Sequence, residues 1–456
     1  MRFSNIPAGV GYALLIVVSI FLAFLNVAVH PFAAFGVIIG GCIFYIAVRS
    51  PFFLLMCFIV FQLGRGADFF PILGQIGAGK YFALSAMGIL VLSKLFNRDL
   101  TIVRTPFNRW MILLTITVLI SSFLGTDPDA SIEFFKEEFM KSVILFFLIV
   151  NIVATKKQLT IFQFCVVGVC VFFAGYASLA QILGEDPLTG AALVEGSRSG
   201  GVGAMNDPND LAMLILISIP FSTVGLIEGK GKLRLLFFLL FAIAISGVLS
   251  TQSRGGLIGL TVGFALVLNK YIKNKILLLS LSAILIIVVT VAAGISDRQV
   301  AADYDNGFDE SSQGRLDAWH AGMRMLIKNP VIGVGFVQFP FNYLDYAENP
   351  VICRPLEAHN TYIQIAAELG VSGIVCFFLL LYMSIKNATL MGRKSKTESK
   401  DLARIIQISA FPSYIAFLIA AVFLSSGYYG IMYVMFASFA ISYNIFELHE
   451  IDSAAI

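Results

Sequence analysis

One arginine lies inside an apolar stretch, where a charged side chain costs free energy. Arg254 lies in "GVLSTQSRGGLIG" at 247–259, where Ser250, Thr251 and Ser253 are good helix caps and a new apolar helix begins. An arginine at such a depth is costly unless it pairs with another group. A helix N-terminus together with a guanidinium group is a natural seat for phosphate oxygens. The pattern therefore favours an anion site at Arg254 over an arginine that only caps a helix.

One of the four histidines also stands where it could do chemistry. His359 lies in "EAHNTYIQIAAELG" at 357–370, where a long polar loop returns to an apolar segment. Asn360 can cap the following helix, and Glu357 is close enough in sequence to help orient an imidazole. A histidine at a desolvated mouth suits proton removal from a hydroxyl group. We favour this role, with a histidine that only completes a helix start as the alternative.

A third polar stretch, "GSRSGGVGAMNDPNDLAML" at 196–214, precedes another apolar segment. Asp207 is predicted to cap a helix, with Pro208 at the first helical position and Asp210 three residues after the cap. This explains the aspartates structurally, without catalysis. Arg198 is a second candidate phosphate ligand, although a loop arginine is more often simply solvated.

No pattern in the sequence calls for a metal or a cofactor. The acidic run "DYDNGFDE" at 303–310 has its glycine one position early for a calcium loop and no glutamate at the twelfth place, which favours a solvated loop. The six cysteines show no disulfide or metal spacing. The basic loop at 228–234 lacks the spacing of a phosphate loop, which argues against a nucleotide site.

The amino-acid composition indicates the environment in which this protein folds. Soluble domains contain about 25% charged residues, whereas only 13% of the 456 residues here are charged and 58% are hydrophobic. The net charge of +3 gives no reason to expect a nucleic-acid partner. The chain is therefore predicted to lie in a lipid bilayer.

The apolar segments predict an all-α polytopic bundle of 12–14 transmembrane helices, since a spanning helix needs about 20 mostly apolar residues. The upper count takes 51–63 as a span, and the lower treats 31–63 as one interfacial hairpin. The candidate spans are 9–28, 31–48, 51–63, 80–96, 107–124, 139–155, 158–182, 208–226, 233–250, 254–270, 275–294, 361–386, 405–425 and 428–447.

Charge predicts the orientation, because lysine and arginine are retained on the cytoplasmic side. With the N-terminus inside, most lysines and arginines fall in short inner loops, and the long loops 64–79, 183–207 and 295–360 lie outside. Both termini are then cytoplasmic. The chain divides into an N-terminal bundle at 1–200, core helices at 201–294, a large outer loop at 295–360 and C-terminal helices at 361–456.

The outer loop contains a predicted amphipathic helix at 314–330 and is otherwise too polar to be buried. The apolar positions share one helical face, which would lie in the outer membrane interface. The helix is either a lid over a lipid headgroup or a packing helix. The face consists of Leu316, Trp319, Met323, Leu326 and Ile327.

Four stretches, in order, resemble the O-antigen ligase and polymerase superfamily of bacterial inner-membrane glycosyltransferases. The resemblance covers about 200 to 373, while the first 200 residues match only as a hydrophobic bundle, and these ligases usually have twelve spans. The stretches are "NDPNDLA" at 206–212, "TQSRGGLIG" at 251–259, "GRLDAWHAGMRMLIKNPVIGVGF" at 314–336 and "EAHNTYIQIAAELGVSG" at 357–373.

The resemblance implies metal-independent glycan transfer from an undecaprenyl-diphosphate donor on the periplasmic face. It assigns diphosphate binding to Arg254 and Arg315, and makes His359 the base that activates an acceptor hydroxyl. The acceptor would be a glycan or lipid A-core. Ligase, polymerase and protein O-glycosylation share these motifs, and the lack of an added soluble domain favours the first two.

Two other classes remain open. A transporter of an anion or a lipid-linked glycan would also have many spans and an intramembrane arginine, but would be expected to show paired broken helices in repeated halves. A peptidoglycan-type polymerase of the shape, elongation and division family would use an acidic site, for which only Asp207 or Asp210 is available.

Overall fold

The computed structural model describes residues 50–75, 77–96, 101–194, 197–203, 206–292, 310–348, 350, 353–394 and 402–445. The predicted spans 9–28 and 31–48, both chain termini and all but the last residue of the acidic run 303–310 lie outside these residues.

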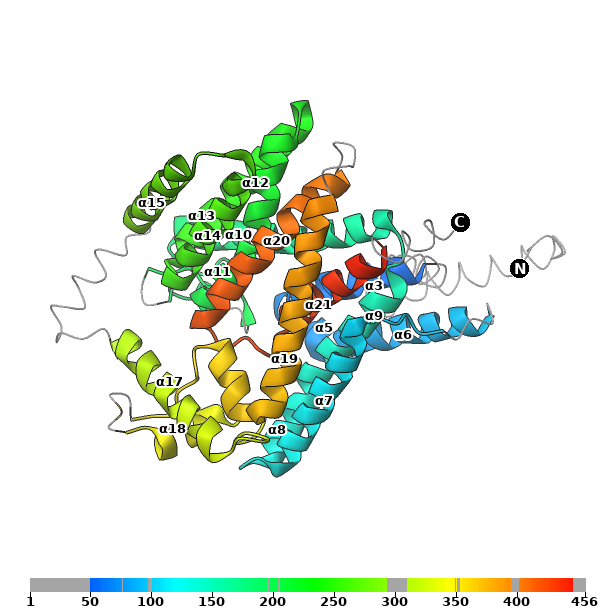
Figure 1. Ribbon diagram of the computed structural model, residues 1–456, viewed down its shortest axis with the longest axis vertical. Coiled ribbons are helices and arrows are strands. Elements are labelled where there is room, and N and C mark those ends of the chain that lie inside the picture. Colours follow the sequence, from blue (N-terminus) through cyan, green and yellow to red (C-terminus); the bar gives the residue numbers. More distant parts are fainter. Residues whose placement is uncertain are drawn as a thin grey trace, which may run out of the picture.

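The described residues form helices joined by loops, with two isolated β-bridges and no strand among them (Figure 1). The helices are α3 (Pro51–Leu63), α4 (Gly66–Phe69), α5 (Pro71–Gln75), α6 (Ala78–Phe96), α7 (Pro106–Leu124), α8 (Pro128–Phe134), the π-helix η1 (Phe135–Phe139), α9 (Met140–Ile152), α10 (Lys156–Leu183), α11 (Pro208–Leu216), α12 (Ser218–Glu228), α13 (Gly231–Thr251), α14 (Arg254–Tyr271), α15 (Lys275–Ala292), α17 (Glu310–Lys328), α18 (Phe339–Tyr346), α19 (Thr361–Lys394), α20 (Leu402–Ala420), the 3-10 helix η3 (Ala421–Phe423) and α21 (Gly430–Tyr443).

Several of these helices are long and apolar enough to cross a bilayer, so the prediction of an all-α polytopic membrane protein is confirmed. Shorter apolar helices at Pro51–Leu63, Ala78–Leu92, Lys275–Val288 and Gly430–Tyr443 accompany them. Within the described part of the chain, six segments meet the length and hydropathy of a span: Pro106–Leu124, Lys156–Leu183, Pro208–Glu228, Gly231–Thr251, Thr361–Met391 and Leu402–Phe423.

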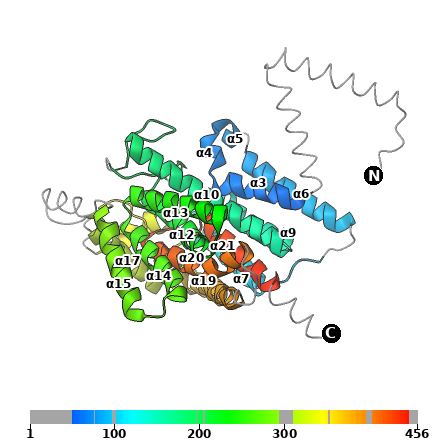
Figure 2. The same ribbon diagram turned by 90° about the horizontal axis from the view of Figure 1, so that it is seen from above.

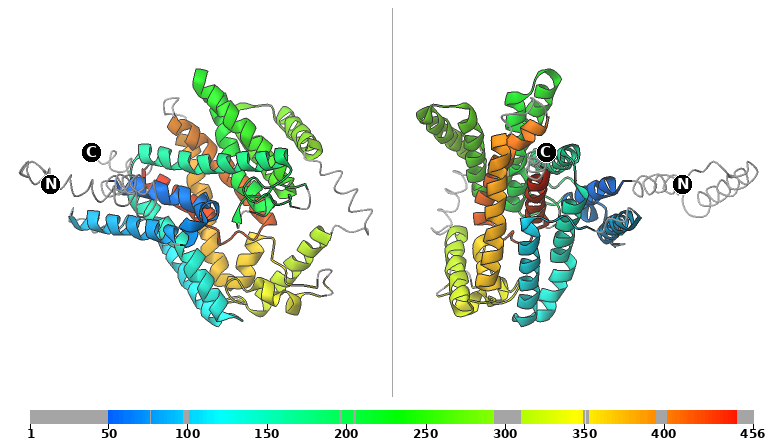
Figure 3. Two further views of the ribbon diagram at one scale, coloured as in Figure 1. Left: turned by 180° about the vertical axis from the view of Figure 1, so that it is seen from behind. Right: turned by 45° about the vertical axis from the view of Figure 1, so that its right-hand side comes forward.

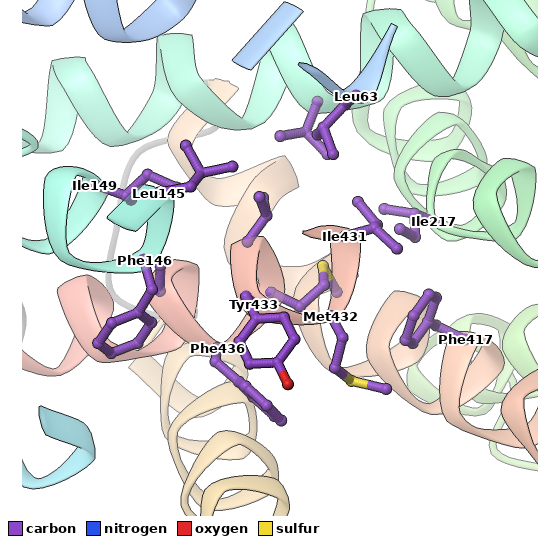
Figure 4. Packing of buried hydrophobic residues seen from close by; sticks show 14 of the residues in the cluster. Leu63, Leu145, Phe146, Ile149, Ile217, Phe417, Ile431, Met432, Tyr433 and Phe436 are labelled. Carbon is purple, nitrogen blue, oxygen red and sulfur yellow. The ribbon is translucent and has the colours of Figure 1, made fainter. Parts of the chain in front are cut away.

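The helices are arranged around a continuous apolar core. Seen from above, α3 and α6 lie on the opposite side of the molecule from α15 and α17 (Figure 2). From behind, α10 crosses between α3 and α13 and contacts both (Figure 3). Near the centre, Met432, Tyr433 and Phe436 of α21 pack near Leu145 and Phe146 of α9 (Figure 4).

Small residues let α14 pack closely against its neighbours. A Cβ atom at Gly256 would lie 2.7 Å from the Cβ of Ala212 in α11, and one at Gly259 would lie 2.8 Å from the carbonyl oxygen of Ala416 in α20. Small residues at such contacts are what allow membrane helices to approach each other. The glycines after Arg254 therefore fix where the start of α14 stands relative to α11 and α20.

The segment predicted as a span at 361–386 is kinked near its start, and Thr361–Met391 still has the length and hydropathy of a span. Gly370 has φ 62° and ψ −160°, and α19 changes direction there. A Cβ atom at Gly370 would lie 2.6 Å from the carbonyl carbon of Val331, so only glycine fits without displacement. The short first part of α19 therefore runs from Thr361 to Gly370, where it contacts residues 330–332 of the outer loop.

The large outer loop has a core of its own, so the expectation that it is too polar to be buried is wrong. Alanines on α17 permit close contact with α18 and α19, and these alanines stand among polar residues in the sequence. The buried residues of this core are Ala318, Ala321, Met325, Val334, Phe339, Tyr343, Ala358 and Ala367.

Part of the apolar face predicted for the amphipathic helix points away from that core, while Trp319 and Leu326 are half-buried. Leu316, Met323 and Ile327 are exposed, the last to 71%. Arg324 pairs with Glu348 at 2.7 Å and so joins α17 to the segment after α18. The exposed face leaves the prediction of an interfacial helix standing.

Candidate functional site

Three helices start close together, and each start is capped by a polar side chain. Asp207 caps α11 by accepting the N–H of Asn209 at 2.6 Å. Ser253 caps α14 by accepting the N–H of Gly256 at 3.1 Å. Asn360 precedes α19 and accepts the N–H groups of its second and third residues at 3.0 and 3.1 Å. All three caps were predicted from the sequence, and all three are confirmed.

Hydrogen bonds join the start of α11 to the start of α14. The side-chain oxygen of Asn209 accepts from the Ser253 hydroxyl at 2.8 Å and from Nη2 of Arg198 at 3.0 Å. Nε of Arg198 donates to the carbonyl oxygen of Thr251 at 3.1 Å. Arg198 is only 6% exposed, so it is not a solvated loop arginine. It holds the loop before α11 against the turn between α13 and α14.

Arg254 follows directly on this joint. It is half-buried at the first position of α14. A Cβ atom at the adjacent Gly255 would lie 3.1 Å from the Cβ of Phe423, so the start of α14 also lies against the segment that follows α20. The preceding Gln252 has φ 49°, in the left-handed region that non-glycine residues seldom adopt. The turn that presents Arg254 is thus tightly constrained on three sides.

His359 is held against that same segment by its backbone. Its N–H donates to the hydroxyl of Ser425 at 2.9 Å, and its φ is 45°, again in the left-handed region. The Ser425 hydroxyl also lowers the pKa of the Glu357 carboxylate, so it acts on both residues that flank Ala358. Ser425 lies 66 residues after His359 in the chain.

Two charged groups from other helices act on the imidazole of His359. Burial lowers its pKa below the usual histidine value, and the nearby guanidinium of Arg315 on α17 lowers it further. The carboxylate of Asp207 opposes both effects. The structure thus brings Arg315, Asp207 and His359 together from α17, the start of α11 and the start of α19.

Glu357 joins the cluster of Asp207, Arg254, Arg315 and His359, and we use the name recess for these five residues. Its side chain is exposed to solvent, yet displacement of water by surrounding protein raises its pKa, and the carboxylate of Asp207 raises it further. The Ser425 hydroxyl opposes this shift. In Figure 1 the starts of α11 and α19 and the end of α20 face α17 around this site.

Sequence reasoning missed two contributors from the segment 424–429, which follows η3. Ser425 contacts His359, and the hydroxyl of Tyr429 lies 3.5 Å from Oδ2 of Asp210. Asp210 is only 7% exposed, so it faces the protein interior beside the recess. The sequence feature that could have pointed to them is the polar run "SSGYYG" at 425–430, which separates two apolar segments.

Among the described residues, no group of three or more histidine, cysteine or acidic side chains has the arrangement of a metal site. A separate cavity of about 50 Å³ lies between α10, α12, α20 and α21, lined by Gln163, Ser409, Ser413 and Ser438 among apolar neighbours. None of the recess residues lines it.

The family model described as O-antigen ligase matches residues 212–378, which include Arg254, Arg315 and His359. Proteins of Rickettsia typhi, Rickettsia conorii and Rickettsia felis that are provisionally named polysaccharide ligases are 25%, 24% and 26% identical to this chain over 181, 195 and 188 residues. The matches cover 38%, 41% and 38% of this chain, and 44% of each relative, so the chain spans less than half of the length of these relatives. These matches, together with the helical membrane fold, support the resemblance of residues 212–378 to the O-antigen ligase superfamily.

Proposed function

We propose that the recess transfers a glycan from an undecaprenyl-diphosphate donor to an acceptor hydroxyl group. The observation that carries the proposal is that Arg254 and His359 both lie at the starts of helices that are connected through polar side chains. Arg254 begins α14, and His359 lies two residues before the start of α19. The start of α11 interacts with both of these starts. Its Asn209 accepts a hydrogen bond from Ser253, which precedes Arg254. The carboxylate of its Asp207 raises the pKa of His359.

The arginines bind the diphosphate in this proposal. A guanidinium is always charged and can donate two parallel hydrogen bonds to phosphate oxygens. Arg254 and Arg315 supply these donors, and Arg198 adds positive charge behind the turn that presents Arg254. Each helix start adds a partial positive charge of about half a unit. This arrangement stabilises the negative charge that grows on the diphosphate as it leaves.

His359 acts as the general base. Its lowered pKa keeps the imidazole neutral at pH 7, so it can accept a proton. The acceptor oxygen attacks the anomeric carbon, the bond from that carbon to the diphosphate oxygen breaks, and the hydroxyl proton passes to His359. The configuration at the anomeric carbon is inverted by this single displacement. The bond energy of the donor drives transfer, so no nucleotide, cofactor or metal takes part.

The recess faces the periplasm in this proposal. At the opposite end of the bundle, Glu228 at the end of α12 accepts from Tyr271 at 3.1 Å and pairs with Arg404 at 3.5 Å. The basic connections 229–234 and 271–275 lie at that end (Figure 1). Because basic loops are retained inside, that end is cytoplasmic, and with it both chain termini, in a bacterial inner membrane.

The acceptor in this proposal is a glycan or lipid A-core, presented from the outer leaflet. The relatives' names favour a ligase over a polymerase. The break in α19 is a feature that a transporter would also show, so a transporter of an anion or lipid-linked glycan is the competing function.

Reconstitution separates these functions. The full chain is placed in liposomes with a synthetic, fluorescently labelled undecaprenyl-diphosphate trisaccharide and purified lipid A-core. The proposal predicts labelled lipid A-core and free undecaprenyl diphosphate in equal amounts. Movement of intact donor across the bilayer, with no covalent product, would instead identify a transporter.

A further inference from the structure

The segment Leu424–Gly427, between η3 and α21, is bound along its length to the start of α19. The Thr361 hydroxyl donates to the carbonyl oxygen of Leu424 at 2.7 Å and accepts the N–H of Ser426 at 3.1 Å. The N–H of Gly427 donates to the side chain of Gln364 at 3.3 Å. These bonds fix the position of the serine between them, Ser425, relative to the residues before α19.

Ser425 uses its hydroxyl group on both sides of the histidine. The oxygen accepts the backbone N–H of His359 at 2.9 Å, and the same hydroxyl lowers the pKa of the Glu357 carboxyl group. One side chain thereby ties together the two polar residues that flank Ala358, which is itself fully buried. A serine hydroxyl offers both a donor and an acceptor at one atom.

The backbone of His359 needs such a restraint. Its φ of 45° lies in a region that costs a non-glycine residue about 1–3 kcal/mol and persists only where the surroundings impose it. The next residue, Asn360, already caps α19, so the chain on that side is fixed. Ser425 supplies the restraint on the other side, at the N–H of His359 itself.

We propose that Ser425 is a positioning residue for His359, holding the imidazole at the angle from which it meets the acceptor hydroxyl, with Glu357 as the second anchor of the serine. This inference rests on the proposed function, in which His359 is the base. Ser425 lies outside residues 212–378, so the family match does not assign it.

Variants of Ser425 test the role directly. Ser425→Ala removes both hydrogen bonds, and Ser425→Thr retains the hydroxyl. Ser442→Ala is the matched control, since the Ser442 hydroxyl bonds only to the carbonyl oxygen of Ser438 within α21. Each full-length variant is measured for its turnover of the labelled donor with lipid A-core and for its affinity for undecaprenyl diphosphate.

A positioning role predicts a split between turnover and binding. Misplacement of a catalytic group by 1 Å can cost about 100-fold, so Ser425→Ala should lower turnover by about 10- to 100-fold. Its affinity for undecaprenyl diphosphate should change by less than about twofold, because the arginines are untouched. Ser425→Thr should recover most of the turnover. A Ser425→Ala protein with wild-type turnover overturns the proposal, as does equal loss of turnover and affinity.

Substitutions of the exposed Glu357 provide a second test that does not disturb a packed segment. The amide oxygen of Glu357→Gln still accepts from the Ser425 hydroxyl, whereas Glu357→Ala leaves that hydroxyl without its acceptor. The proposal predicts near wild-type turnover for the glutamine variant and a loss of about tenfold for the alanine variant. Equal turnover in the two variants contradicts it.

His359→Ala separates failure of this inference from failure of the proposed function. If His359→Ala is inactive while Ser425→Ala and Glu357→Ala are fully active, His359 remains the base and only the positioning role falls. If His359→Ala retains wild-type turnover, the base is elsewhere, and both proposals fall.

Discussion

The hydroxyl group of Ser253 donates a hydrogen bond of 2.8 Å to the side-chain oxygen of Asn209. This bond joins the start of α14, where Arg254 is the first residue, to the start of α11, which Asp207 caps. Asn209 also donates to the carboxylate of Asp207 at 2.9 Å, and that carboxylate in turn raises the pKa of His359. A short path of side chains therefore leads from the start of α14 to the imidazole proposed for the acceptor.

Removal of the imidazole should stop transfer. General-base catalysis contributes about 10²–10⁴-fold, so His359→Ala should lower the turnover of labelled donor by at least about 100-fold. Its affinity for undecaprenyl diphosphate, measured by titration of the purified protein, should stay within about threefold of wild type. Turnover near the wild-type value would assign the base to another residue.

Arg254 should not tolerate lysine. A lysine keeps the charge but loses the planar pair of donors, so Arg254→Lys and Arg254→Ala should each lower turnover by about 100-fold or more. The matched control is Arg234→Lys, because Arg234 lies at the opposite end of the bundle and bonds to the carbonyl oxygen of Gly229. A fully active Arg254→Lys protein would count against bidentate contact with the diphosphate.

Arg315 should set the acid limb of the pH profile. The base must be neutral, so turnover falls as the pH drops through the pKa of His359, which burial and Arg315 both lower. Arg315→Gln removes a positive neighbour, so that pKa should rise and the acid limb should move to higher pH. Asp207→Asn should move it to lower pH.

The measurement is turnover at saturating donor, normalised to each variant's maximum. Arg324→Gln serves as the control on the same helix, because Arg324 pairs with Glu348. An acid limb that stays in place in Arg315→Gln would show that Arg315 does not act on the base.

Gly370 should be essential for the fold at the break in α19. An alanine there would adopt φ 62° and place its Cβ within 2.7 Å of the backbone at Pro330 and Ile332. Gly370→Ala should therefore lower the free energy of unfolding by about 1–3 kcal/mol. Gly88→Ala is the control, since a Cβ there meets nothing within 4 Å.

Thermal unfolding of the detergent-solubilised proteins compares the two. We expect the thermal unfolding midpoint of Gly370→Ala to lie below that of the wild type, and that of Gly88→Ala to equal or exceed it. Equal midpoints would mean that the backbone at residue 370 can relax into a regular helix.

Local patterns predicted the features that depend on a few neighbouring residues. The helix class, the caps Asp207, Ser253 and Asn360, and the helix end at Asn329 and Pro330 all follow from short-range propensity and capping chemistry. These predictions succeed because a cap needs only its own helix.

Long-range relationships were not accessible in the same way. The contact of Ser425 with His359 joins residues 66 positions apart and leaves no periodic signal. The sequence favoured a solvated loop arginine at Arg198, because its acceptors at Thr251 and Asn209 are set by helix packing. The break at Gly370 was hidden inside an apolar run whose length suited a span.

The most direct test of the central claim is a cryo-EM structure of the full chain with bound undecaprenyl diphosphate. The account predicts diphosphate oxygens within about 2.7–3.2 Å of the guanidinium of Arg254, with the imidazole of His359 lining the same recess. Diphosphate density bound elsewhere on the protein, or a wall of protein between it and His359, would contradict the account.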